Sequence, residues 1–276
     1  MKKIIFICVN FNNYQYTEKF IISLSQQASI GIKFELQIIV IDNSTDVLDS
    51  VRIRKFCSIF KWISYIKSDS NLGYFHGLNI GIQSIYPLTY DHVIICNNDL
   101  VFDSMFCSLL CDLSIDKNIF ALCPDIISRD GLHQNPLLIR RPSLLFKLKM
   151  DFYFSNYYFA LISSFFKKVV VKTARLFGSN ASTELILITQ EIHSGLGACY
   201  ILSPIFLDSV KTLYYPSFLF SEETCLSAQI HLNKGILMFV PQLKVFHDES
   251  ASLSKMPSKI KYGYGKNSHW LLRHLM

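Results

Sequence analysis

Short apolar runs alternate with helix-like segments through the first half of the chain, and this alternation constrains the fold more strongly than any other feature. The apolar runs are rich in β-branched residues and lack a polar side, as do strands that are buried on both faces of a sheet. The predicted strands are Ile4–Val9, Leu36–Ile41, Trp62–Ile66, His92–Cys96 and Ile119–Cys123, and the predicted helices are Tyr14–Gln27 and Tyr74–Ser84. The alternation predicts an α/β protein with a central sheet.

The second half resumes this pattern after a basic and aromatic interruption at residues 140–182. The elements expected there are strands at Gly197–Leu202, Ile236–Val240 and Leu243–Phe246, a helix from Pro204 and a helix at Glu222–Asn233. The two halves are separated by neither an internal repeat nor a low-complexity linker. We therefore expect one α/β domain that carries a helical insertion rich in basic and aromatic residues.

Polar side chains follow three of the predicted strands, at the point where each strand ends. They are Asn10-Phe11-Asn12, Asp42 and Asn97-Asn98-Asp99. Each group alone is ordinary turn or capping chemistry. Three groups together favour a ligand site, because open α/β sheets bind ligands at the carboxyl ends of their strands. In such a site Asp42 would hold a ribose hydroxyl, and Asp99 would hold a divalent cation, Mg²⁺ or Mn²⁺.

Neither of the familiar phosphate-binding loops is present. The sequence contains no G-x-G-x-x-G and no G-x-x-x-x-G-K-[ST] motif, which argues against a Rossmann dehydrogenase and against a P-loop NTPase. A bound nucleoside diphosphate would then have to be neutralised by a metal ion. A turn that contains an aspartate suits that role better than a glycine cradle does.

Two adjacent acids, Glu222-Glu223, follow the aromatic run Tyr214–Phe220. Acids in the first turn of a helix favour the helix dipole, and this alone explains one of them. Neighbouring residues of a helix point about 100° apart, so one acid can face a cleft while the other caps the helix. A glutamate beside aromatic side chains has a raised pKa and suits a general base.

A histidine follows the last predicted strand and stands before three polar residues. This residue, His247, precedes Asp248-Glu249-Ser250. A lone histidine is more often a structural hydrogen-bonding group than a ligand, although its place after a strand is also compatible with a metal site.

Taken in order, these motifs resemble glycosyltransferase family 2, the nucleotide-sugar transferases with the GT-A fold. The matching segments are CVNFNN (8–13), VIDNSTD (40–46), NLGYFHGLNIGI (71–82), ICNNDL (95–100), HSGLGACYILS (193–203), FLFSEETCLSAQIHLNKG (218–235) and VFHDESAS (245–252). Within this family the chain is most similar to the bacterial polysaccharide branch, which includes rhamnosyltransferases and other O-antigen or capsule transferases. The resemblance implies a GT-A-type single domain with a mixed, mostly parallel sheet flanked by helices.

The resemblance also implies a nucleotide-sugar site. Val9, Phe11 and Asp42 would line the nucleoside pocket, and the loop of Asn71 and Gly73 would close beside the nucleotide and the sugar. Asn97 and Asn98 would also face the donor, because Asn97-Asn98-Asp99 falls on the family's D-x-D motif. Asn97 replaces the first acid of that motif, which leaves Asp99 as its only carboxylate. His247 matches a late histidine of the family that completes the metal site.

Glu222-Glu223 falls on the E-D motif of the family, whose second acid is the catalytic base. That base would here be Glu223, with Glu222 as the alternative. The implied reaction is an inverting transfer from a UDP- or dTDP-sugar to a hydroxyl of a glycan or a lipid-linked acceptor. Two other classes stay open: a non-catalytic, transferase-like subunit of a polysaccharide assembly complex, and a sugar nucleotidyltransferase. The second would need a glycine- and lysine-rich loop after the first strand, where this chain has asparagines.

On this basis the chain divides into four segments. Residues 1–124 form the nucleotide-binding half, 125–195 a variable segment that includes the insertion, 196–254 the acceptor and catalytic half, and 255–276 a basic C-terminal tail.

The net charge of +6 is concentrated in two of these segments. Residues 140–175 hold eight Lys and Arg against one acid, and residues 255–276 hold five and no acid. With the aromatic residues beside them, the basic residues suit an interfacial helix on an anionic membrane. A hairpin that packs on the domain is the alternative, and no motif supports nucleic acid. Eight cysteines without a C-x-x-C pair indicate reduced thiols, so we expect a cytoplasmic protein at the inner face of a bacterial cell membrane.

Overall fold

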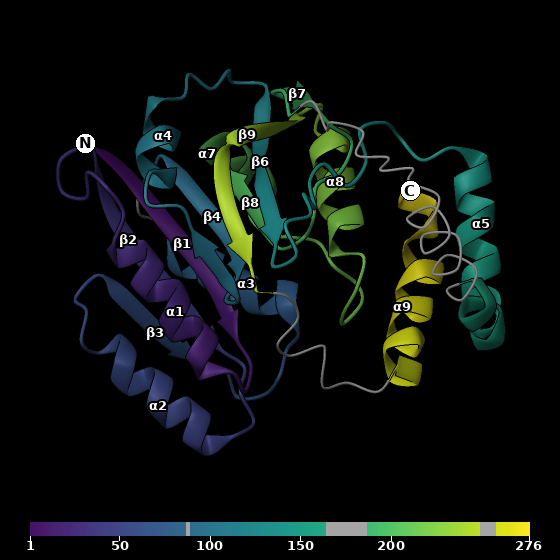
Figure 1. Cartoon of the computed structure of the whole chain (residues 1–276), viewed down its shortest axis with the longest axis horizontal. Helices are drawn as coiled ribbons and strands as arrows, with labels where there is room; N and C mark the ends of the chain where they lie inside the picture. The colour runs from purple at the N-terminus through teal and green to yellow at the C-terminus, as the bar shows by residue number, and fades with distance from the viewer. Residues whose placement is uncertain (87–88, 164–186, 249–257) are drawn as a thin grey trace.

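A nine-stranded sheet forms the centre of the computed structural model, which describes residues 1–86, 89–163, 187–248 and 258–276. The strands follow the order β3-β2-β1-β4-β8-β6-β9-β5, and β7 pairs with β9. The first four in this order are parallel: β3 (Ile63–Lys67), β2 (Phe34–Asp42), β1 (Lys2–Asn10) and β4 (His92–Asn97). Their carboxyl ends therefore meet at one edge of the sheet (Figure 1).

The second half of the sheet is mixed. Its strands are β8 (Cys199–Leu202), β6 (Ile119–Ser128), β9 (Ile236–His247), β5 (Leu100–Phe102) and β7 (Gln190–Glu191). β8 is antiparallel to both β4 and β6, β6 is parallel to β9, and β5 and β7 are antiparallel to β9. The antiparallel pairing of β5 with β9 brings residues just after β4 close to the end of β9.

Alternation along the strands divides the core into two layers. On β1, Phe6 and Cys8 face one layer, whereas Ile5 and Ile7 face the other. The first layer is covered by α1 (Tyr14–Ser25), α2 (Val47–Cys57) and α4 (Phe106–Asp112), and the second by α3 (Tyr74–Ser84), α7 (Pro204–Val210) and α8 (Glu222–Leu232). The prediction of a mixed, mostly parallel sheet flanked by helices is therefore confirmed.

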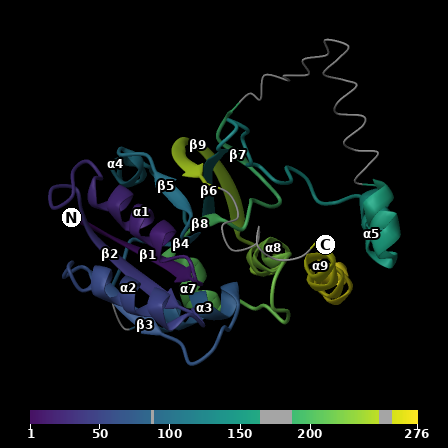
Figure 2. The same cartoon turned by 60° about the horizontal axis from the view of Figure 1, so that its bottom comes forward.

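The helices α5 (Leu144–Ser155) and α9 (Ser258–Leu272) pack on each other beside the sheet (Figures 1 and 2). Asp151 on α5 accepts hydrogen bonds from His269 at 2.8 Å and from both Nε and Nη2 of Arg273. Arg273 begins a short 3₁₀ helix, Arg273–Leu275. None of the described helices combines the length and the apolar character that crossing a bilayer requires.

Two expectations about the strands were wrong. The strand predicted to end at Cys123 runs on as β6 to Ser128, because a register shift between Pro124 and Asp125 accommodates the proline, which has no N–H to pair. The two late strands are one, β9, which continues through Pro241. In the described part of the predicted interfacial helix, Asn156 separates α5 from helical residues 157–163.

The basic end of that predicted helix lies outside the described residues. The residues concerned are Phe165, Phe166, Lys167, Lys168, Lys172 and Arg175. Helices α2, α4 and α9 and strands β5 and β7 were not predicted, because they are short or carry little apolar periodicity.

Candidate functional site

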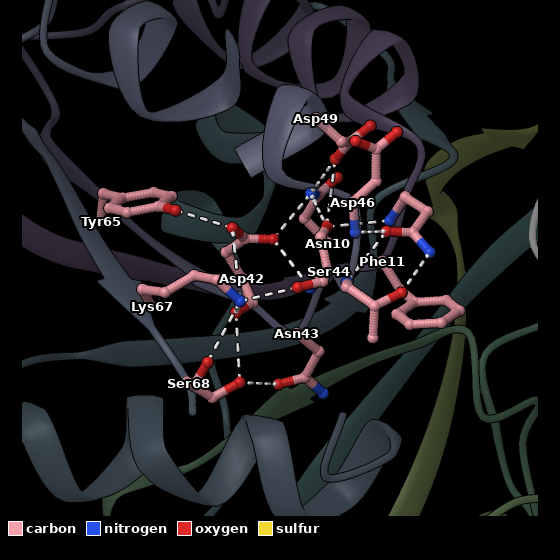
Figure 3. A network of polar contacts seen from close by, with 12 residues as sticks. Asn10, Phe11, Asp42, Asn43, Ser44, Asp46, Asp49, Tyr65, Lys67 and Ser68 are labelled. Atoms are coloured by element: carbon pink, nitrogen blue, oxygen red, sulfur yellow. Dashed lines mark hydrogen bonds and ion pairs between the residues drawn. The ribbon is translucent and has the colours of Figure 1, made fainter. Parts of the chain in front are cut away.

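Asn10 is the centre of a buried hydrogen-bond network at the carboxyl ends of β1 and β2 (Figure 3). Its amide nitrogen donates to Asp42 Oδ1 at 3.0 Å and to Asp49 Oδ1 at 2.8 Å. Its amide oxygen accepts from the Thr17 hydroxyl at 2.8 Å. Asn10 was predicted only as part of the polar group Asn10-Phe11-Asn12 and was given no role of its own, although a fully buried amide at the end of an apolar strand is a signal that sequence reasoning can use.

The structure places Asp42 inside this network and fully buried. Its carboxylate accepts from Asn10, from the Ser44 backbone N–H at 3.0 Å and from the Tyr65 hydroxyl at 2.7 Å (Figure 3). Burial alone would raise the pKa of Asp42, but the hydrogen bonds it accepts outweigh burial, and the net effect lowers its pKa. Its charge therefore holds together the ends of three neighbouring strands, β1, β2 and β3.

The loop of Asn71 and Gly73 packs against the segment that leads to α8. Asn71 Oδ1 accepts from the Gly73 N–H at 3.0 Å, and Gly73 has a φ of +82°. A β-carbon on Gly73 would lie 2.6 Å from the Phe218 carbonyl oxygen, so this approach requires glycine. Asn43 donates to the Gly73 carbonyl at 2.9 Å and so ties the loop to β2. Asn43 was not predicted as a site residue.

Val9 and Phe11 lie at the end of β1 and are both partly exposed. A β-carbon on Gly77 would lie 3.0 Å from Val9, so α3 approaches this strand end closely. Val9 and Phe11 are therefore accessible beside the Asp42 network, as their predicted role requires.

The turn after β4 carries Asn97, Asn98 and Asp99. The Asn97 N–H donates to the Ala198 carbonyl at 2.8 Å, which ties the turn to the start of β8. Asn98 is buried, and its amide donates to Asn13 and to Thr17, each at 2.7 Å. Asn98 therefore faces the start of α1, where it joins the Asn10 network.

Asp99 and His247 face each other although they are far apart in the sequence. Leu100 pairs with His247 in the β5–β9 ladder, and the Asp248 N–H donates to the Asp99 carbonyl at 3.1 Å. These contacts place Asp99 Oδ1 3.4 Å from His247 Nε2. Both atoms are buried and have no hydrogen-bond partner among the described residues. His247 Nδ1, in contrast, is 2.8 Å from Gln134 Oε1.

This pair fits a divalent cation. A buried polar atom without a partner costs about 1–3 kcal/mol, and a cation bound to both atoms would remove that cost. Carboxylate oxygen and imidazole nitrogen are both ligands of Mn²⁺ or Mg²⁺ sites. Within the described parts of the chain no third His, Cys, Asp or Glu converges on such a site, which leaves coordination positions for oxygens of a ligand or of water.

The acidic pair at the start of α8 divides into two environments. Glu222 is buried and accepts from the Phe220 N–H at 3.1 Å. Burial, and then the charge of Glu223, raise the pKa of Glu222 to about 8. Burial also raises the pKa of Glu223, whose side chain stays partly accessible. A β-carbon on Gly197 would lie 3.4 Å from Glu223 Oε2, so this carboxylate lies against the start of β8.

The loop that enters α8 is strained and firmly held. Phe220 and Ser221 have φ values of +72° and +66°, a left-handed conformation that costs non-glycine residues about 1–3 kcal/mol each. The Tyr215 hydroxyl donates to the Phe220 carbonyl at 2.6 Å, and the Ser268 hydroxyl on α9 donates to the Leu219 carbonyl at 2.6 Å. These contacts fix the direction in which Glu222 and Glu223 leave the loop.

Tyr74, at the start of α3, feels the charges of both Asp99 and Glu222. Its hydroxyl donates to the Gly197 carbonyl at 3.2 Å, beside Glu223. Burial raises the pKa of Tyr74 well above its ordinary value, and the charges of Glu222 and Asp99 add to this effect. The phenol therefore stays neutral while it donates to the Gly197 carbonyl.

Solved structures of glycosyltransferases share this fold. A structure of GalNAc-T7 with UDP, GalNAc and Mn²⁺ has a TM-score of 0.61 and 13% identity, with 94% of this chain and 46% of that chain covered. S. aureus TarS 1–349 in complex with UDP-GlcNAc gives 0.58 and 14%, with 93% and 62% covered. The mannosyltransferase PcManGT from Pyrobaculum calidifontis, in complex with GDP-Man and Mn²⁺, gives 0.56 and 11%, with 91% and 58% covered.

The chain thus spans about half to three fifths of the length of these proteins, and the likeness establishes a GT-A-type fold. No protein-family model matches the sequence, and comparison with curated proteins gives no match.

Proposed function

We propose that this protein is a glycosyltransferase that transfers a sugar, with inversion, from a nucleoside diphosphate sugar to a hydroxyl group. The observation that carries this proposal is the pair of Asp99 Oδ1 and His247 Nε2, which face each other without a hydrogen-bond partner among the described residues. The same chain also carries a partly exposed acid, Glu223, at the start of α8. Structural neighbours of this chain hold UDP, UDP-GlcNAc or GDP-Man, two of them with Mn²⁺, and this supports a nucleotide-sugar donor.

Each part of the site then has a role. Val9, Phe11 and the Asn71–Gly73 loop bind the nucleoside side of the donor, while Asp42 and Asn10 hold the strand ends behind them. Asn97 and Asn98 keep the turn of Asp99 in place. Asp99 and His247 would hold Mn²⁺ or Mg²⁺, which when bound stabilises the negative charge that builds up on the leaving diphosphate.

Glu223 removes the proton from the acceptor hydroxyl. The residue is partly exposed, and its raised pKa brings it closer to the pH at which a general base works best. The hydroxyl oxygen then attacks the anomeric carbon on the face opposite the leaving diphosphate. Glu222 is turned into the protein and bound to the loop, so we assign it to the support of Glu223.

The biological setting that we propose is the synthesis of bacterial cell-surface polysaccharide, such as O-antigen or capsule. The donor would be a UDP- or dTDP-linked hexose or rhamnose, and the acceptor a glycan or a lipid-linked glycan. This setting rests on the sequence resemblance described above. A non-catalytic subunit with the same fold is the second candidate, and it is favoured only by Asn97 in place of the first acid of the D-x-D motif.

A panel of nucleotide sugars tests the activity directly. Purified protein with Mn²⁺ or Mg²⁺ should release nucleoside diphosphate from one class of donor, and a chelator should abolish the release until metal is restored. Glu223→Gln should still bind the donor, as measured by thermal shift, while turnover is lost. A protein that binds donors but releases no diphosphate with any acceptor glycan would support the non-catalytic candidate.

We also propose that α5 and α9 attach the enzyme to an anionic membrane at its cytoplasmic face. No residue of α5 is buried, and its exposed side chains include Leu144, Leu145 and Leu148 beside Lys149. Trp270 and Leu271 of α9 are also exposed. Apolar side chains that project from a basic pair of helices match the boundary of an anionic bilayer.

Vesicle binding tests this attachment with a matched control. Leu145→Asp should lower binding to vesicles that contain phosphatidylglycerol. Leu232→Asp is the matched control, because the two leucines are similarly exposed (79% and 77%). It should not lower binding, because Leu232 lies at the end of α8, outside the two helices. Lys149→Glu should weaken binding most at low salt. Equal binding by all three variants would leave the two helices without a membrane role.

A further inference from the structure

Gln134 contacts the imidazole of His247 at the nitrogen that faces away from Asp99. Gln134 Oε1 lies 2.8 Å from His247 Nδ1. An amide oxygen only accepts hydrogen bonds, so the hydrogen of this contact belongs to Nδ1. In the neutral ring Nε2 then carries a lone pair, and Nε2 is the atom that lies 3.4 Å from Asp99 Oδ1.

This arrangement explains why the two facing atoms have no hydrogen bond. Asp99 Oδ1 and His247 Nε2 are both acceptors in this tautomer, and two buried acceptors that face each other repel unless a cation lies beside them. The opposite tautomer would place the hydrogen on Nε2, toward Asp99, and would turn the lone pair of Nδ1 toward the acceptor Gln134 Oε1 at 2.8 Å. Gln134 therefore selects the tautomer that is suited to bind a metal ion.

The residues on both sides of Gln134 are anchored to β6. His133 Nδ1 lies 2.8 and 3.0 Å from the two carboxylate oxygens of the fully buried Asp125. The Asn135 amide donates to the Pro124 carbonyl at 2.8 Å. The Gln134 N–H itself donates to the Ile126 carbonyl at 2.8 Å. β6 also pairs with β9, where Ser128 is opposite His247. Both partners of the contact are therefore held against β6.

From these contacts we propose that Gln134 is a positioning residue that fixes the Nδ1–H tautomer of His247 and thereby keeps Nε2 available as a metal ligand. The proposal rests on the metal site of the proposed function. It adds a residue that lies outside every motif of the sequence resemblance, in the segment 125–195 that was expected to vary. Gln134 does not bind the metal itself.

The tautomer is measured in the metal-free protein by ¹⁵N NMR of the histidine side chains at pH 8.5, with His247→Asn used to assign the signals. Wild-type His247 should carry its hydrogen on Nδ1. Gln134→Leu removes the acceptor but keeps the size of the side chain and the backbone N–H, so Nε2–H should become populated. Gln134→Glu keeps an acceptor and should restore Nδ1–H. Gln83→Leu, on the exposed side of α3, serves as the control.

Metal affinity gives the second readout. Mn²⁺ binding in the presence of UDP, followed by electron paramagnetic resonance, should weaken by about 10–100-fold in Gln134→Leu and by less than twofold in Gln83→Leu. The proposal is overturned if Gln134→Leu keeps the Nδ1–H signal, or if it binds Mn²⁺ as tightly as the wild type. A wild type that binds no Mn²⁺ would contradict the metal site of the proposed function, and the NMR result would then decide the tautomer separately.

Discussion

Two polar regions lie at the same edge of the sheet and are built in opposite ways. Around Asn10 and Asp42, every oxygen of the Asp42 carboxylate accepts a hydrogen bond from the chain itself. Around Asp99 and His247, two buried atoms face each other without a hydrogen-bond partner among the described residues. The first region is complete without a ligand, so its polar groups stabilise the fold. The second is incomplete, so its polar groups are available for chemistry.

Glu223 is the proposed general base, and its substitution should have the largest effect. Glu223→Gln should lower turnover by about 10²–10⁴-fold, the usual contribution of a general base. Glu222→Gln should lower turnover by less than about 10-fold, because that side chain is bonded to the loop. Steady-state release of nucleoside diphosphate measures both, and equal losses in the two variants would remove the distinction between the acids.

Asp42 belongs to the complete region, and its loss should mainly affect stability. Asp42→Ala leaves several buried donors without an acceptor and should lower the free energy of unfolding by about 2–5 kcal/mol. Asp46→Ala is the control, since that exposed residue only caps α2 and should cost about 0.5–2 kcal/mol. Urea unfolding compares the two. A stable Asp42→Ala protein that has lost donor binding would instead make Asp42 a direct contact to the nucleotide.

Asp99 should behave in the opposite way to Asp42. Asp99→Asn should weaken Mn²⁺ binding by about 100-fold, since even residues behind the metal ligands contribute about 10–100-fold. The metal-free variant should be as stable as the wild type or more stable, because the substitution removes a buried carboxylate oxygen that lacks a partner. Isothermal titration and thermal unfolding measure the two effects, and a marked loss of stability would contradict the comparison.

The smallest effect that we predict is a pH dependence at Glu222. The folded protein keeps this carboxyl protonated up to a pKa of about 8, whereas the unfolded chain releases the proton near its ordinary pKa of about 4.5. The stability of the wild type should therefore fall as the pH rises between these values. Glu222→Gln does not titrate and should gain about 2 kcal/mol relative to the wild type between pH 5.5 and pH 7. Urea unfolding at both pH values checks the sign.

Strands β1, β2 and β4 were predictable because they are largely buried on both faces, which requires continuous apolar runs such as Ile4–Val9. Boundaries that depend on pairing were not predictable. β6 passes Pro124 only because a register shift against β9 absorbs the missing N–H, and that shift is a property of two distant strands. β5 was also missed, since three residues give no periodicity and its pairing with β9 is what defines it.

The sequence resemblance named Asp99, Glu223 and His247 as candidates, and the structure brings the side chains of Asp99 and His247 to face each other. The sequence alone did not separate residues that face a ligand from residues that hold the fold. Asp42, Asn98 and Asp99 are all polar residues at strand ends, so the sequence does not distinguish them. The structure does, because Asp42 and Asn98 bind Asn10 and Thr17 of the chain itself. Gln134 was missed, and Asn10 was given no role of its own, because their importance lies in contacts 113 and 32 residues away along the chain.

The hydrogen bond from Ser268 to the Leu219 carbonyl has a consequence for the order in which the protein is made. Ser268 is buried on α9, and it holds the strained loop from which Glu222 and Glu223 depart. A ribosome finishes α8 well before it reaches residue 268, so during synthesis the acidic pair leaves the exit tunnel before the helix that fixes its loop. The loop before α8 therefore reaches its final conformation only after α9 has emerged and docked.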